Sequence, residues 1–129
     1  MKYQIRDVPL LKKILWADNL LGGVTGVAGL LLYSLLTDFL GLPAILIVII
    51  AAVTLGYALL ALRLALQSTP SILLLRILIY ANWVWTIIGV ALLIFYIKDA
   101  TLFGAAFLIL QVVVVGLLAY LEGRHIVIK

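Results

Sequence analysis

The residues of this chain that could do chemistry are few, and the most conspicuous is Asp18, which lies just inside a long apolar segment. An ionisable side chain in such a segment is costly to bury, so it commonly marks a functional site. Arg63, Arg76 and Glu122 are expected at the same end of three further apolar segments. Two acids and two bases, one from each segment, predict either a charge-balanced layer that closes one end of a helix bundle or a proton-coupling site at Asp18.

A second set of candidates is neutral and follows helical spacing. Residues at i, i+4, i+7, i+11 and i+14 share one helix face. Two such stripes are near copies of each other: Asn19, Gly23, Gly26, Leu30 and Tyr33, and then Asn82, Thr86, Gly89, Leu93 and Tyr96. They predict either a seam between the first and third helices, with the asparagines hydrogen-bonding across it, or a small polar pocket for a ligand head group. Trp83 could stack on that ligand, and Gln111, near the middle of the fourth segment, is expected to reach across to Asn82 or Thr25.

Glycines accompany these polar residues and predict close helix packing. Small residues let helix backbones approach each other, and Gly22 and Gly26 have the G-x-x-x-G spacing that is typical of such contacts. Gly26 and Gly89 occupy corresponding places in the two stripes, and Gly23 lies on the same face as Gly26. We therefore expect Gly22, Gly23, Gly26 and Gly89 to be helix-packing positions.

Other chemistry is excluded by the residue types that are missing. The chain has no cysteine, which excludes disulfides, thiolate metal sites and the four-helix reductases that use a Cys-x-x-Cys pair. The single histidine, His125, excludes a bis-histidine haem within one bundle. There is no Ser-His-Asp set and no glycine-rich phosphate loop, and one acid offers no acid–base pair. We expect a protein that is not an enzyme and has no metal or cofactor.

Composition places the chain in a membrane. It is 67% hydrophobic and 11% charged, with a mean hydropathy of +1.37, whereas a soluble domain has about 25% charged residues. Four uncharged runs, residues 19–37, 39–62, 77–97 and 100–121, each approach or exceed the roughly 20 residues that a spanning helix needs. The sequence predicts one all-α membrane domain over residues 1–129, with spans at about 14–36, 44–66, 72–97 and 101–122. Thr69 is expected to cap the third helix, with Pro70 as its first residue.

An internal repeat organises these spans. Residues 10–66 and 73–122 correspond at an offset of 63, which aligns Asn19 with Asn82, Gly26 with Gly89 and Gly41 with Gly104. Each half holds two spans, so both halves enter the membrane in the same direction. The sequence therefore predicts an up-down four-helix bundle of two similar hairpins, related by a pseudo-two-fold axis along the membrane normal.

The basic residues predict the orientation. Eight of the nine fall on the side of the termini and the middle loop, and only Lys98 falls on the other, beside Asp38 and Asp99. The positive-inside rule then places both termini in the cytoplasm, in what we expect to be a bacterial inner membrane. The net charge of +4 is explained by these helix ends and by anionic lipid head groups, so we expect no nucleic-acid partner.

The chain resembles small uncharacterised bacterial four-helix membrane proteins, in which an Asn near the start of the first and third spans precedes a glycine stripe. Asn19 to Gly26 and Asn82-Trp83 to Gly89 carry this resemblance, which implies the fold and no activity. Asp18 is also similar in kind to the single membrane carboxylate of dimeric four-helix exporters, although theirs is a Glu near mid-span. Three functions remain open: an accessory or scaffold subunit with a membrane-protein partner, a binder of a lipid-like molecule between the hairpins, or a proton-coupled exporter that works as a homodimer through Asp18.

Overall fold

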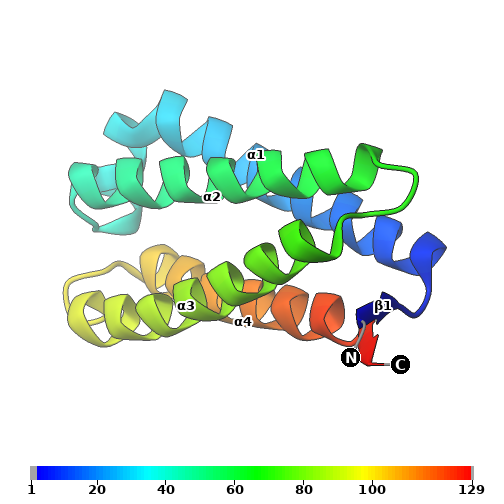
Figure 1. The fold of residues 1–129 in the computed structure, drawn as a ribbon. Coiled ribbons are helices and arrows are strands. Elements are labelled where there is room, and N and C mark those ends of the chain that lie inside the picture. Colours follow the sequence, from blue (N-terminus) through cyan, green and yellow to red (C-terminus); the bar gives the residue numbers. More distant parts are fainter. Residues whose placement is uncertain (1–2, 129) are drawn as a thin grey trace.

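A computed structural model describes residues 3–128 and contains four long helices (Figure 1). In chain order the elements are β1 (Tyr3–Ile5), α1 (Val8–Leu40), α2 (Ala44–Leu66), α3 (Ile72–Tyr96), α4 (Leu102–Gly123) and β2 (Ile126–Ile128). Helix α1 extends beyond the predicted span 14–36 at both ends. Lys2 and Lys129, which contribute to the predicted orientation, lie outside the described residues.

Short polar side chains cap the starts of α1, α3 and α4, Pro43 precedes α2, and a glycine ends α1. Asp7 caps α1 by accepting a hydrogen bond from the Leu10 amide at 3.1 Å. Gly41 follows α1 with a φ of +68°, the left-handed conformation that glycine adopts without strain. The cap of α3 is Ser71, not Thr69 as the sequence predicted. The Ser71 hydroxyl accepts from the Leu74 amide, which makes Ile72 the first residue of the helix.

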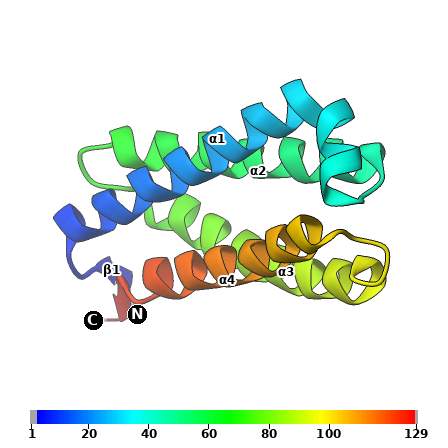
Figure 2. The same cartoon turned by 180° about the vertical axis from the view of Figure 1, so that it is seen from behind.

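The helices form two hairpins, α1 with α2 and α3 with α4, which lie one above the other (Figures 1 and 2). Each helix is long and apolar enough to cross a membrane. Large apolar side chains cover the outer surface of all four, where lipid would replace water as the neighbour. The predicted all-α, four-helix architecture is confirmed at this level. We call the end that carries β1, β2 and residues 67–71 the terminal end, and the other end the turn end.

Within the first hairpin, the glycines of α1 pack against α2. A Cβ on Gly26 would lie 2.8 Å from Leu55 Cβ and 2.9 Å from the Ala51 carbonyl oxygen, and a Cβ on Gly29 would lie 2.7 Å from Ala51 Cβ. The predicted seam between the first and third helices therefore does not use this face. These small residues of α1 pack against α2, because a short turn places α2 antiparallel beside α1. In the second hairpin Gly89 likewise faces Val112 of α4.

We expect Gly26→Ala to destabilise the protein by about 1–3 kcal/mol, because the added methyl group overpacks the α1–α2 contact. Gly23→Ala is the matched control, since a Cβ there would meet nothing within 4 Å. Alanine is the better helix former, so Gly23→Ala should be neutral or stabilising by up to about 1 kcal/mol. Unfolding of both variants in mixed detergent micelles measures the difference. Equal stability of the two variants would contradict the packing.

The terminal end is closed by a small two-stranded sheet that the sequence did not predict. Strands β1 and β2 pair antiparallel, with Gln4 opposite Val127 and Ile5 opposite Ile126. Ile5 and Ile126 pack against a buried cluster supplied by α1, α2 and α3. Members of that cluster are Leu11, Leu15, Ala61, Leu64, Ala65, Leu75, Leu78 and Ile79. The two hairpins are therefore tied together at this end by both backbone pairing and apolar packing.

The turn end is closed by contacts between the two turns. The Thr101 amide donates to the Leu40 carbonyl oxygen at 3.0 Å, and the Thr101 hydroxyl donates to the Phe39 carbonyl oxygen at 2.7 Å. The rings of Phe39 and Phe103 stack with centroids 4.5 Å apart. Gly104 lies directly against the Leu40 carbonyl, where a Cβ would overlap it. The hairpins are thus joined at both ends of the molecule.

Candidate functional site

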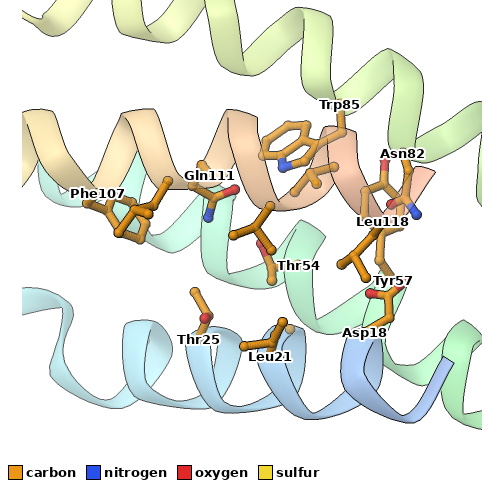
Figure 3. A pocket seen from close by; sticks show the side chains of 14 residues that line it. Asp18, Leu21, Thr25, Thr54, Tyr57, Asn82, Trp85, Phe107, Gln111 and Leu118 are labelled. Carbon is orange, nitrogen blue, oxygen red and sulfur yellow. The ribbon is translucent and has the colours of Figure 1, made fainter. Parts of the chain in front are cut away.

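Between these two closures, the hairpins form a partly open cavity of about 210 Å³ (Figure 3). All four helices contribute to its wall. The lining residues are Asp18, Leu21, Gly22, Thr25, Thr54, Tyr57, Asn82, Trp85, Phe107, Leu110, Gln111, Val114, Val115 and Leu118. Asp18, Tyr57 and Asn82 gather at one end of the cavity, and Phe107 lies at the other (Figure 3). The cavity is therefore apolar over most of its length and polar at one end.

The polar end is built around a buried cluster of Asp18, Asn82 and Glu122. Their side chains are 5%, 2% and 0% exposed, respectively. Asn82 Nδ2 donates to Glu122 Oε1 at 2.9 Å, and Asp18 is close enough to both neighbours to interact with each. One residue each from α1, α3 and α4 thus meets at a single point. A carboxyl from each hairpin lies there, with one amide as the shared partner.

The surrounding side chains hold this cluster in place. Thr86, one turn further along α3, donates its hydroxyl to the Asn82 carbonyl oxygen at 2.8 Å. Tyr57 of α2 donates across the hairpin interface to the Ala81 carbonyl oxygen at 3.3 Å. The Tyr57 ring also meets Trp85 edge to face, with centroids 6.4 Å apart. Tyr57 therefore fixes the distance between α2 and α3 beside the cluster.

Several polar atoms at this end have unmet hydrogen-bonding capacity. Asp18 Oδ2, Thr54 Oγ1 and Glu122 Oε2 are buried without a hydrogen-bond partner. Asp18 and Thr54 belong to the cavity wall. Buried polar groups in proteins are almost always hydrogen-bonded, and an unpartnered one costs about 1–3 kcal/mol. The cavity wall thus offers hydrogen-bonding positions to a polar group that enters it.

A second, apolar cavity of about 160 Å³ lies towards the turn end. It shares Thr25 and Phe107 with the first cavity. Its other lining residues are Ala28, Gly29, Leu36, Leu40, Ile47, Ile50 and Ala51. The two spaces are therefore neighbours that share part of their walls, and the second one is formed mainly by α1 and α2.

The structure brings only part of the predicted ligand-binding set together. Asn82 and Gln111 line the cavity. Asn19 is half-buried and outside the wall, and Thr86 is occupied with the Asn82 backbone. Trp83 is 43% exposed on the outside of α3, because it is one residue from Asn82 and a helix turns by about 100° per residue. Trp85, three residues beyond Asn82, faces inward instead.

The predicted four-residue charge layer is only half assembled. Asp18 and Glu122 come together, but Arg63 is exposed at the end of α2. Arg76 is half-buried, with its guanidinium carbon 6.0 Å from the centre of the Tyr80 ring. The acids lie against Asn82 and each other, and the part of the two arginines in a charge-balanced layer stays a prediction.

The sequence did not single out Thr54 and Tyr57 as residues of the cavity wall. The internal repeat does distinguish the two acids of the site. Asp18 aligns with Ala81 and Glu122 aligns with Leu59 at the offset of 63. The two carboxyls of the cluster therefore occupy positions where the two halves differ, whereas Asn82 occupies a position where they match, opposite Asn19.

No protein-family model, curated protein or solved structure matches the chain. The resemblance to small bacterial four-helix proteins is thus not joined by any family assignment. Fold and site together define a class: four apolar helices, each able to cross a membrane, packed as two hairpins around an internal cavity. These features are those of a multi-pass membrane protein with a partly polar cavity between its hairpins.

Proposed function

We propose that this protein is a non-enzymatic integral membrane protein that binds a small lipid-like molecule between its two hairpins. The observation that carries the proposal is the partly open, mostly apolar cavity with the unpartnered Asp18 carboxyl oxygen at its polar end. Small-molecule sites are typically concave and mostly apolar, with a few converging polar groups. The ligand's polar group would meet Asp18, and its apolar part would lie along the second cavity.

This proposal is favoured over a scaffold or accessory role by where the small residues are used. A scaffold would present a flat face of small residues to a partner helix. In this protein the small residues of α1 instead pack against α2, as Gly22, Gly26 and Gly29 do. What faces outward is a surface of large apolar side chains, which suits lipid.

The membrane placement forms part of the proposal. The terminal end, with Arg6, Lys12, Lys13, Arg63 and Arg124, would face the cytoplasm of a bacterium, and the turn end would face outward. Both hairpins begin and end at the terminal end, which fits a pseudo-two-fold axis along the membrane normal (Figure 1). Reporter fusions at the termini and in residues 97–101 test the orientation.

Native mass spectrometry of protein released gently from its own membrane tests ligand binding. The expected result is a retained small molecule at one copy per chain. A stoichiometric second polypeptide would favour an accessory subunit instead. A bare chain that takes up no lipid when lipids are added back would contradict the proposal.

We expect Thr25→Phe to abolish this retention, because Thr25 lines both cavities and a benzyl group there would occupy their junction. Val24→Phe is the matched control, since Val24 is the neighbouring residue and is 68% exposed on the outer surface. The ligand signal in native mass spectra should disappear only in Thr25→Phe. Retention in both variants would place the ligand elsewhere.

A second candidate, a proton-coupled exporter, is favoured by one observation. Asp18 and Glu122 come from different hairpins and meet in a buried site, so a proton held there would depend on how the hairpins lie against each other. An exporter working as a homodimer would appear as a bare dimer in the same mass spectra. Its flux after reconstitution would be lost in Asp18→Asn, and unchanged flux would exclude it.

A further inference from the structure

Resting on the proposed binding function, we infer that the ligand is an organic cation: an amine in its ammonium form that carries an apolar group. The inference comes from the charge and hydrogen-bonding balance of the cavity wall, which has the carboxyl of Asp18 and further acceptors at one end and no lysine or arginine. It names the class of ligand for the site. It also predicts that the site prefers a cation to a neutral or anionic molecule of similar shape, which the proposed binding of a lipid-like molecule does not by itself require.

The first support is the charge balance. Two carboxyl groups, Asp18 and Glu122, lie together in the buried cluster, and Asn82 provides an amide donor to them. None of the residues that line the cavity is a lysine or arginine. A carboxylate away from water is strongly destabilised unless a cation or several donors compensate it. An anionic ligand would add to this imbalance, whereas an ammonium group would correct it.

The second support is the hydrogen-bonding capacity of the wall. Asp18 is nine-tenths buried or more, and its Oδ2 atom has no partner. It points into the cavity from α1 (Figure 3). Thr54 adds a second unpartnered oxygen from α2. An ammonium group carries several N–H donors and no acceptor, so it matches these oxygens better than a hydroxyl does.

The third support is aromatic. Tyr57 and Trp85 form part of the wall beside Asp18 and Asn82. Aromatic rings attract cations through their quadrupole, most strongly where water is excluded. A carboxyl and two aromatic rings in one cavity are thus complementary to a cation with an apolar body, which the remaining apolar wall would accommodate.

The other charged groups near the site do not line the cavity and so do not compensate the Asp18 carboxyl within it. Lys12, Lys13 and Arg63 lie nearer the terminal end of their helices, and Arg76 is not among the residues that line the cavity. His125, just after α4, directs its Nδ1 to the Leu121 carbonyl oxygen at 2.7 Å. The groups that meet Asp18 are therefore Asn82 and Glu122, with Tyr57 in the adjoining wall.

The test compares three probes of one shape and different charge: benzylammonium, benzyl alcohol and benzoate. The full-length protein is placed in nanodiscs of a neutral lipid with Trp16→Phe and Trp83→Phe, which leaves Trp85 in the cavity wall as the only tryptophan. Trp85 fluorescence then reports binding, and equilibrium dialysis of the unmodified protein checks it. We expect benzylammonium to bind at least about tenfold more tightly than either other probe, as befits a charge-assisted hydrogen bond.

Asp18→Asn should remove this preference, and Asp38→Asn, an exposed position of the same helix near the turn end, should keep it. Equal binding of benzylammonium and benzyl alcohol, lost in Thr25→Phe, would overturn the cation inference and leave the proposed cavity function standing. Failure of benzylammonium to bind the unmodified protein would also overturn the inference. The proposed function is judged separately, by the lipid retained in native mass spectra. The dialysis comparison of the three probes needs only the unmodified protein, so it holds even if Asp18→Asn misfolds.

Discussion

Gly104→Ala is expected to be the most damaging single methyl group that can be added to this protein. A Cβ on Gly104 would overlap the Leu40 carbonyl, which also accepts the Thr101 amide. A backbone carbonyl cannot turn aside as a flexible side chain can, so the two turns must separate. We expect a loss of about 3 kcal/mol or more in the free energy of unfolding, at the upper end of overpacking effects.

Detergent unfolding, followed by circular dichroism, measures this loss. Gly56→Ala is the control, because Gly56 lies exposed on α2 and a Cβ there would meet nothing within 4 Å. That control should be neutral or slightly stabilising. If Gly104→Ala were as stable as Gly56→Ala, the contact between the turns would be wrong. Widening at the turn end should also loosen the apolar cavity beside Leu40.

Asn82→Leu is expected to have the second largest effect. The substitution removes the amide that donates to Glu122 at 2.9 Å and leaves that fully buried carboxyl without this donor. An orphaned buried polar group costs about 1–3 kcal/mol, and more if it is charged. Unlike Gly104→Ala, this change should act at the terminal end of the bundle and leave the turns in contact.

A double-mutant cycle with Glu122→Leu separates this effect from a simple change in packing. Each single variant leaves one polar partner without its hydrogen bond, whereas the double variant removes both partners. The two losses in the free energy of unfolding should therefore not add. We expect a coupling of about 1 kcal/mol or more, within the usual range for residues in direct contact. Additive losses would mean that the hydrogen bond contributes nothing to stability. Asn19→Leu, the aligned position in the first hairpin, should cost less because Asn19 is only half-buried.

The sequence predicted the helices well because their signal is local. Uncharged runs of sufficient length and a repeat at an offset of 63 were enough to predict four helices in two hairpins. The strands β1 and β2 were not predicted, because each has three residues and depends on a partner at the other end of the chain. The seam was assigned to the wrong helix pair, since one glycine face can serve either neighbour and only the tertiary packing selects between them.

The site was predicted less well, and for a related reason. Asp18, Asn82, Gln111 and Glu122 stood out because polar residues are rare in this chain. Tyr57 did not stand out, because its hydrogen bond to the Ala81 carbonyl oxygen depends on how α2 packs against α3, which its spacing does not show. Pairing Arg63 and Arg76 with the acids followed from counting charges by helix end. Long arginine side chains at helix ends can reach the interface, and that option cannot be seen in the spacing.

The meeting of Asp18 with Glu122 also has a consequence for how the protein is made. The ribosome delivers Asp18 in the first helix and Glu122 only at the end of the last, so the first hairpin enters the bilayer with a carboxyl that lacks both of its eventual neighbours. Lipid is a poor environment for that group, although Asp18 lies towards one end of α1 and therefore costs less than the roughly 2.5–3.5 kcal/mol of a carboxylate at a helix centre. The cluster of Asp18, Asn82 and Glu122 can form only after α4 has been made, so the site is completed by the last helix.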